Sequence, residues 1–298
     1  MEFKAIPEEI ARLRTLKELF EQSIERFADA DALALREGKS WTYRAVGDAV
    51  KRVRSVLASR GASRGSRVGL LAENSPEWGI AYLAVTTMGA VVVPILPDFS
   101  ASEIEAILEH CGAELVVVSA SLGSKLGENR DAIRRLDLSE LVNNTLDGDG
   151  ATGEDAEGQG GAPEATDLAA LLYTSGTTGQ PKGVMLTHGN LVQNIISSRS
   201  VVEIGTGDRF LSVLPLAHSY ECTIGFLVPF ASGGSVTYLG KPPVLSVLLP
   251  ALKEIKPTMM LTVPLIMEKV YQSRVKPLFT GNVVMRIVGK IPPLRRLI

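Results

Sequence analysis

Hydrophobic positions recur along this chain with two different spacings. Between residues 44 and 59, apolar side chains return every three or four positions and predict an amphipathic helix. The stripe that would face the core consists of Val46, Ala49, Val50, Val53 and Leu57. Short unbroken apolar runs instead predict buried strands at 67–72, 91–95 and 115–118.

Helix-starting signals separate these predicted strands. Ser75 supplies an N-cap and Pro76 a preset first helical position, which predicts a helix that ends near Gly89. Ser102 and Glu105 have the spacing of a capping box ahead of another amphipathic helix. Strands that alternate with helices across short turns predict an α/β fold with a largely parallel sheet.

Residues 147–167 interrupt this pattern. The segment is rich in Gly, Asp, Glu and Ala and contains no basic residue, so it buries too little apolar surface to offset the entropy of ordering. It is predicted to be a flexible acidic loop between a first α/β half, 1–146, and a second half, 168–298. Either the loop links two domains, or it connects two halves of one sheet system.

The alternation resumes after this loop. Further strands are predicted at 169–173, 210–214, 235–239 and 259–262. Helices are predicted at 191–198, 222–230, 245–254 and 265–272. Lysine and arginine dominate the charged residues of 268–298, where a solvated helix face followed by a loop is the simplest interpretation. Peripheral contact with a membrane is the alternative.

Composition excludes several classes of function. The near-neutral net charge of −2 gives no support for a nucleic-acid binder, whose phosphate contacts would call for a basic face, so no nucleic-acid partner is expected. Cys111 and Cys222 lie far apart without metal-ligand spacing, which argues against a zinc site and a disulfide scaffold. The first residues lack the apolar core of a signal peptide, and no apolar run approaches the roughly 20 residues of a membrane-spanning helix. A cytoplasmic protein is the expectation.

A loop of small and hydroxyl-bearing residues follows the strand predicted at 169–173. Phosphate oxygens need many close donors, which inward-turned backbone N–H groups at glycines and Ser or Thr hydroxyls supply. Lys182 closes the loop with a compact positive charge. A plain surface turn is the alternative, but the position after a buried strand favours phosphate binding. The loop consists of Thr174, Ser175, Gly176, Thr177, Thr178, Gly179, Gln180, Pro181 and Lys182.

This loop differs from that of P-loop NTPases, in which Lys directly follows Gly and precedes Ser or Thr, because Pro181 precedes Lys182 and Gly183 follows it. Instead, Tyr-Thr-Ser-Gly-Thr-Thr-Gly-x-Pro-Lys-Gly-Val at 173–184 resembles the signature loop of the adenylate-forming (AMP-binding) superfamily. That superfamily includes acyl-CoA synthetases, luciferases and peptide-synthetase adenylation domains. With flanking segments such as Trp41-Thr42-Tyr43, the resemblance covers about residues 15–275.

The resemblance implies that residues 1–298 form an incomplete N-terminal adenylation domain, with stacked, largely parallel sheets flanked by helices. It implies that a carboxylate attacks the α-phosphate of ATP, and that a thiol, normally of coenzyme A, then displaces AMP. Charge neutralisation and positioning would carry the first step. Thr174 would contact Mg²⁺ and act in catalysis with Lys182. The residues implied to hold the phosphates are Ser175, Gly176, Thr177, Thr178, Gly179 and Lys182.

A second motif points to the acid substrate. Leu-Pro-Leu-Ala-His-Ser-Tyr-Glu at 214–221 resembles the next family element, in the version found in long-chain fatty acyl-CoA synthetases. The resemblance implies that His218 lies near the carboxylate of a fatty acid or other carboxylic acid and acts in catalysis, and that Glu221 helps to bind this substrate. A packing role for His218 and a surface or capping role for Glu221 are the alternatives. Leu265 stands where the related sequences usually have Arg.

Later family elements are missing from the sequence: a Tyr-Gly-x-Thr-Glu segment, a ribose-binding Asp and a C-terminal domain with a catalytic Lys. Thr206-Gly207-Asp208 lies too early to be the ribose motif and predicts a turn. One hypothesis is a portion of an acyl-CoA ligase, inactive or incomplete alone. The other is a non-catalytic module of the same fold that binds nucleotide or a partner. Exposed apolar surface predicts self-association or pairing with a complementary C-terminal chain.

Overall fold

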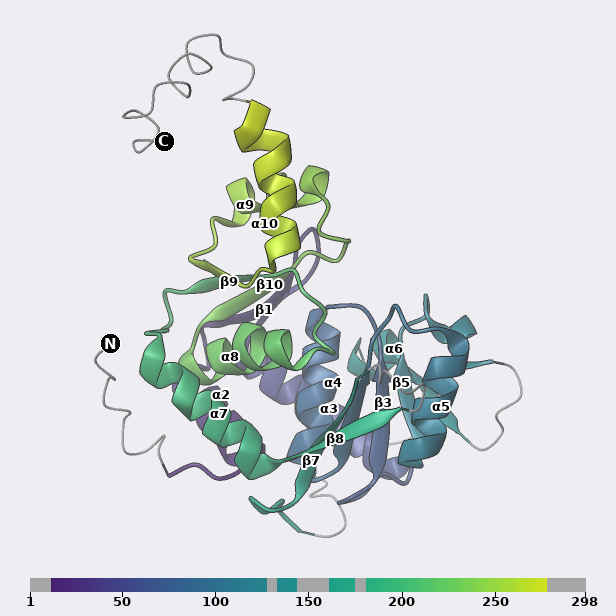
Figure 1. The fold of residues 1–298 in the computed structure, drawn as a ribbon. Helices are drawn as coiled ribbons and strands as arrows, with labels where there is room; N and C mark the ends of the chain where they lie inside the picture. The colour runs from purple at the N-terminus through teal and green to yellow at the C-terminus, as the bar shows by residue number, and fades with distance from the viewer. Residues whose placement is uncertain (1–11, 128–132, 144–160, 175–180, 278–298) are drawn as a thin grey trace.

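Two β-sheets organise the chain, and most neighbouring strands in both run parallel (Figure 1). The computed structural model describes residues 12–127, 133–143, 161–174 and 181–277. Sheet B has the order β6-β5-β3-β4-β7-β8, and its edge strand β8 is antiparallel to β7. Its strands are β3 (Arg67–Leu71), β4 (Val91–Ile95), β5 (Leu115–Val118), β6 (Arg134–Asp137), β7 (Leu168–Thr174) and β8 (Lys182–Thr187).

Sheet A has the order β11-β9-β10-β1-β2. The pairs among β11, β9, β10 and β1 are parallel, and β2 returns antiparallel to β1 at the edge. Its strands are β1 (Asp31–Leu35), β2 (Ser40–Thr42), β9 (Arg209–Ser212), β10 (Ser235–Tyr238) and β11 (Met259–Met260).

One hydrophobic cluster joins the two sheets through a central layer of helices (Figure 1). Leu33 and Val236 enter it from sheet A, and Val68 and Val92 enter it from sheet B. The helical segments that contribute to it are α2 (Leu16–Phe27), α3 (Tyr43–Ser59), α4 (Pro76–Thr87), α6 (Leu138–Asn143), α7 (His188–Val201), the π-helical η2 (Glu221–Leu227) and α8 (Val228–Ser232).

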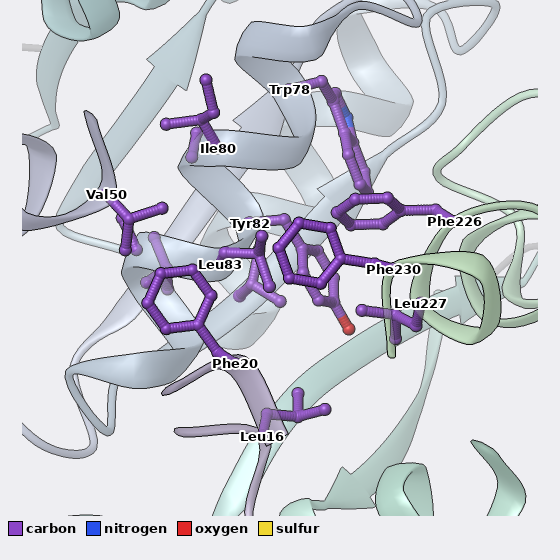
Figure 2. Packing of buried hydrophobic residues seen from close by; sticks show 14 of the residues in the cluster. Leu16, Phe20, Val50, Trp78, Ile80, Tyr82, Leu83, Phe226, Leu227 and Phe230 are labelled. Carbon is purple, nitrogen blue, oxygen red and sulfur yellow. The ribbon is translucent and has the colours of Figure 1, made fainter. Parts of the chain in front are cut away.

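Aromatic side chains fill the middle of this layer (Figure 2). Trp78 and Tyr82 of α4 stack with ring centroids 5.3 Å apart, and Phe226 of η2 meets the Tyr82 ring edge-on at 6.2 Å. Phe230 of α8 continues the row at 6.1 Å from Phe226. Such large buried rings contribute several kcal/mol each by removing apolar area from water.

Further helices cover the outer faces of the sheets. On sheet B, α5 (Ala101–Cys111) packs against β4 and β5, and its interior face includes Ile104 and Leu108. On sheet A, α9 (Leu245–Ile255) packs against β9 and against Leu239, which directly follows β10. The remaining helical segments are η1 (Gly123–Leu126), α10 (Pro264–Val270) and the π-helical η3 (Tyr271–Val275).

Local signals predicted from sequence are confirmed at most positions. The Ser75 hydroxyl accepts from the Trp78 N–H with Pro76 at the start of α4, and residues 205–208 form the turn that precedes β9. The capping box of α5 was placed wrongly, because Ser100 and Glu103 form it instead of Ser102 and Glu105. Both pairs fit the same spacing rule, so the spacing alone does not choose between them.

The segments on either side of residues 147–167 contribute strands to both sheets, so they are interleaved in space. The mixed α/β architecture with largely parallel sheets flanked by helices is therefore confirmed. Most of the acidic loop, 147–160, lies outside the described residues. Among the residues that the structure covers, no helix has the length and hydropathy needed to cross a bilayer.

Candidate functional site

A cavity of about 1190 Å³ lies where the carboxyl ends of strands from both sheets meet. Sheet B contributes the turns after β3 and β4, and sheet A contributes the segments after β9 and β10. The polar and charged residues of its lining are Glu73, Asn74, Asp98, Ser212, Lys241, Ser246, Glu268, Lys269, Gln272 and Ser273. The apolar residues are Pro97, Val213, Leu214, Pro215, Leu239, Pro242, Pro243, Val244, Leu245, Val263, Leu265 and Ile266.

The strand order of sheet B explains this location. The chain runs from β3 to its neighbour β4 and then crosses back over β3 to β5, so the strand order reverses at β3. Ligands of open α/β sheets bind outside the carboxyl ends of strands at such a point. Glu73 and Asn74 follow β3, and Asp98 follows β4, so all three side chains come from this edge of the sheet.

Hydrogen bonds hold the two turns at this edge in place. The Ser119 and Ser121 hydroxyls each donate to the Glu73 carboxylate at 2.7 Å. Burial opposes ionisation of Glu73, but these bonds outweigh it and hold the pKa of the carboxyl below its ordinary value. Lys125 donates to the carbonyls of Pro97 and Phe99, at 2.5 and 3.0 Å. Both turns are therefore anchored from outside the cavity.

The predicted phosphate loop connects two paired strands. β7 ends at Thr174 and β8 begins at Lys182, and these two exposed residues are cross-strand partners. Since β7 runs parallel to β4, its carboxyl end lies at the same edge of sheet B as the cavity. The other residues predicted to hold phosphate, Ser175, Gly176, Thr177, Thr178 and Gly179, lie outside the described residues.

Gly183 has a steric reason to be a glycine. It pairs across the strands with Tyr173, and a Cβ at this position would lie 3.1 Å from the Tyr173 ring. The Tyr173 hydroxyl is in turn hydrogen-bonded to Nδ1 of His110 on α5 at 2.7 Å. The ring is therefore held from both sides, and a side chain at residue 183 would push on the strand that leads into the loop.

His218 lies on the segment that leads from β9 to η2. Its side chain is exposed, its N–H donates to the Pro215 carbonyl at 3.0 Å, and its own carbonyl accepts from the Cys222 N–H at 2.9 Å. Leu214 and Pro215 line the cavity, so His218 stands close to the cavity in sequence. His218 itself is not among the residues that line the cavity in the described part of the chain.

Glu221 is in the interior, with 1% of its surface exposed. Within the described chain neither carboxylate oxygen has a hydrogen-bond partner. Burial raises the pKa of this carboxyl to about 7, and the Ser212 hydroxyl and Val213 N–H moderate the rise without reaching hydrogen-bond geometry. A Cβ on Gly225 would lie 2.7 Å from the carboxyl carbon. The structure thus places Glu221 behind Ser212 and Val213, which line the cavity.

A family model whose description is "AMP-binding enzyme" matches residues 20–290. The chain belongs to this family. The signature segment that the sequence analysis identified lies on the hairpin of β7 and β8.

Two curated relatives illustrate the range of this AMP-binding enzyme family. The chain is 33% identical over 248 residues to "Long-chain-fatty-acid--CoA ligase FadD15" of Mycobacterium tuberculosis, which covers 78% of this chain and 41% of that protein. It is 30% identical over 237 residues to "Tyrocidine synthase 3" of Brevibacillus parabrevis, which covers 79% of this chain and 4% of that protein. The chain therefore spans about two fifths of the length of the fatty acid ligase and a small part of the synthase.

Solved structures show the same fold. The N-terminal domain of FACL13 from Mycobacterium tuberculosis superposes with a TM-score of 0.77 at 23% identity, covering 88% of this chain and 66% of that chain. The N-terminal subdomain of NpsA from Klebsiella oxytoca superposes with a TM-score of 0.76 at 22% identity, covering 92% of this chain and 66% of that chain. The chain thus has the same fold as these N-terminal subdomains.

Magnesium fits this site only as a companion of bound phosphate. Across the described ranges, no group of three or more His, Cys, Asp or Glu could hold a metal ion. Thr174 offers one exposed hydroxyl at the start of the loop. Mg²⁺ commonly keeps several waters and binds through one or two protein oxygens together with substrate phosphates. One hydroxyl is consistent with that mode of binding.

Sequence reasoning missed Glu73, Asn74 and Asp98 as residues of the site. Each stands within three residues of the end of a strand that was predicted correctly, so the rule that ligands bind at strand carboxyl ends could have found them. His188 is a different case, because it is buried, and its Nδ1 accepts from the Leu16 N–H at 3.2 Å. It joins α7 to α2 in the interior and lies four residues after the signature segment 173–184.

Proposed function

We propose that this chain forms the phosphate- and acid-binding part of an ATP-dependent, AMP-forming carboxylate–thiol ligase, with a fatty acid as the acid. One observation carries the proposal: the hairpin that bears Thr174 and Lys182 and the largely apolar cavity lie at the same edge of sheet B. A triphosphate and the carboxylate of an apolar acid could therefore meet at that edge.

The chain's own residues would act mainly by neutralising charge and by positioning. Lys182 and the loop of Ser175 to Gly179 would hold the β- and γ-phosphates, and Thr174 would contact the accompanying Mg²⁺, which neutralises phosphate charge. A carboxylate oxygen of the acid then bonds to the α-phosphorus as the bond to pyrophosphate breaks. In the second step the thiolate of coenzyme A bonds to the acyl carbon, and AMP leaves. Positioned charges of this kind act without a protein nucleophile.

The lining of the cavity supports a fatty acid over a small polar acid. Apolar residues from the segments after β10 and β11 form most of one wall, including Val244, Leu245 and Val263. Burying methylene groups against such a wall contributes about 0.8 kcal/mol each. His218 would lie near the acid carboxylate from the loop beside the cavity. The curated relatives include both fatty acid ligases and peptide synthetases, so the acid is the part of the proposal that needs a direct comparison.

The test is ATP–pyrophosphate exchange by the purified chain with a panel of acids: fatty acids of increasing length and the proteinogenic amino acids. We expect exchange that depends on a fatty acid and falls roughly 100-fold or more in Lys182→Ala, since a removed electrostatic donor typically costs that factor. Lys51→Ala, an exposed lysine of α3, is the matched control and should exchange like the parent.

Other outcomes separate the alternatives. Exchange that depends on amino acids alone would refute the fatty acid and keep the ligase. The chain could bind ATP in a way that Lys182→Ala abolishes and yet catalyse no ATP–pyrophosphate exchange with any acid of the panel. That result would identify a nucleotide-binding module and refute catalysis by this chain. A folded chain that binds no ATP would refute the proposal as a whole.

A further inference from the structure

Asn74 joins the two sheets at the cavity through all the polar groups of its side chain. Its amide nitrogen donates to the Leu214 carbonyl at 2.6 Å and to the Ser212 hydroxyl oxygen at 3.3 Å. Its amide oxygen accepts from the Leu216 N–H at 2.8 Å. An Asn side chain offers one carbonyl oxygen and an amino group with two donors, so both ends of this amide are engaged.

These bonds connect segments that are distant in sequence. Asn74 stands in the turn after β3 of sheet B, directly before the Ser75 N-cap of α4. Ser212 is the last residue of β9 in sheet A, and Leu214 and Leu216 belong to the segment that follows it. The separations are 138 to 142 residues, so one side chain sets how this segment sits against the other sheet.

The segment that Asn74 holds leads directly to His218. The Pro215 carbonyl accepts the His218 N–H at 3.0 Å, so the backbone between the two contacts of Asn74 is hydrogen-bonded to His218 itself. Leu216 is buried, with 1% of its surface exposed, and anchors the same segment in the core. Asn74 and Ser212 line the cavity themselves. The amide therefore controls a wall of the cavity together with the backbone that carries His218.

We propose that Asn74 is a positioning residue for acid binding: it clamps the segment from Leu214 to Leu216 against the β3–α4 turn and so sets the place of His218 beside the cavity. The role of this clamp in acid binding rests on the function proposed above. The clamp itself is a structural claim about hydrogen bonds and can be tested without any activity.

Aspartate is the most informative substitution because it keeps the shape and changes the hydrogen-bond sense. In Asn74→Asp the Leu216 N–H retains an acceptor, but a carboxylate oxygen replaces the donor that faces the Leu214 carbonyl at 2.6 Å. Two acceptors at that distance repel each other, so the segment moves away from the turn. Asn74→Ala removes all three bonds, and Asn74→Ser serves as a milder replacement if either variant fails to fold.

The experiment has two structural readouts and one kinetic readout on the 298-residue chain. Amide hydrogen exchange reports on Leu216, and ring signals of His218 are easily followed because the chain has only three histidines. We expect the Leu216 amide to exchange about tenfold faster in Asn74→Ala, since one lost hydrogen bond is worth about that factor. His218 ring shifts should move in all Asn74 variants. In ATP–pyrophosphate exchange by the Asn74 variants, KM for the acid should rise about tenfold while KM for ATP changes less than about twofold.

Asn194→Asp is the matched control, because Asn194 is an exposed residue of α7 far in sequence from the clamp, and it should behave like the parent. The proposal is overturned if the Asn74 variants match Asn194→Asp in Leu216 exchange and His218 shifts. It is also overturned if KM for ATP and for the acid rise equally. If the parent chain catalysed no ATP–pyrophosphate exchange, this would count against the proposed function. Amide hydrogen exchange at Leu216 and the His218 ring shifts would still test the clamp.

Discussion

Helices α4 and α10 both begin with a proline, but one is buried and the other is exposed. Each has proline at its first position, Pro76 in α4 and Pro264 in α10, and each has an apolar sequence. In α4 every residue except Glu77 is buried, whereas α10 has no buried residue among those described. Leu265 and Met267 of α10 are 59% and 55% exposed.

The difference comes from what surrounds each helix. α4 packs in the central layer with strands of both sheets, so all of its faces meet apolar partners, and its sequence accordingly has no polar stripe. α10 follows the short strand β11 in the chain and contributes Leu265 and Ile266 to the lining of the cavity, and Figure 1 shows it beside α9, away from the central layer of helices. Apolar composition therefore identifies a helix in both cases, but the burial of that helix is decided by its position between layers.

The largest expected effect is in α4. Trp78→Ala removes a fully buried ring that packs on Tyr82 and Phe226 (Figure 2), so we expect a loss of about 3–5 kcal/mol in the free energy of unfolding. Urea unfolding followed by circular dichroism measures it. Met267→Ala in α10 is the paired substitution and should stay within about 0.5 kcal/mol of the parent. A loss below about 1 kcal/mol in Trp78→Ala would contradict the packing described for the central layer.

The second effect is a pH dependence of stability that arises from a buried carboxyl group. Burial raises the pKa of Glu221 in η2 to about 7 from the ordinary carboxyl value of 4.5. Its contribution to stability is therefore complete below pH 4.5 and is lost as pH rises to about 7. Glu221→Gln keeps the shape without the titration. We expect the stability of the variant relative to the parent to rise by on the order of 3 kcal/mol between pH 4.5 and 8.

His188 opposes Glu221 over the same range, which is why the variant is needed to separate them. Burial lowers the pKa of His188 to about 4 from 6.5, so its contribution is complete above pH 6.5 and is lost as pH falls to about 4. Urea unfolding at half-unit pH steps gives the comparison, with Glu25→Gln on the exposed face of α2 as the control for removing one charge. If the free energy of unfolding of Glu221→Gln and of the parent changed with pH in parallel, Glu221 would ionise in the folded protein without loss of stability, which would contradict the prediction.

The third effect is a reversal of sign. Gly→Ala inside a helix ordinarily stabilises by about 1 kcal/mol. At Gly79 of α4, however, a Cβ would lie 3.1 Å from the Phe226 ring and 3.3 Å from Leu33. Overpacking costs about 1–3 kcal/mol, so Gly79→Ala should destabilise the protein in urea unfolding. In a Phe226→Leu background, Gly79→Ala should lower the free energy of unfolding by less than it does in the parent. Purely additive effects of the two substitutions would argue against this contact.

The sequence predicts those features that depend on local patterns. β3, β4 and β5 are buried on both faces and therefore appear as unbroken apolar runs, and the loop at Thr174 is recognisable from its own residues. β8 was missed because it is an edge strand, largely exposed, without apolar alternation. The burial of Glu221 was not foreseen, since a π-helical turn shifts which residues face inwards. Asn74 acts across about 140 residues, and no local pattern contains such a contact.

The smallest expected effect on stability is at α10, where an unchanged free energy of unfolding is the informative result. Leu265→Ser removes an exposed apolar side chain, so the free energy of unfolding should change by less than about 0.5 kcal/mol. The same substitution reduces the exposed apolar surface that Leu265 forms with Met267 and Tyr271, so Leu265→Ser should associate no more strongly than the parent in sedimentation velocity. Leu248→Ser in α9, a buried position against sheet A, is the contrast and should unfold the protein more easily. If Leu265→Ser proved as destabilising as Leu248→Ser, α10 would have to be covered in solution, and the contrast with α4 would fail because both helices would be buried.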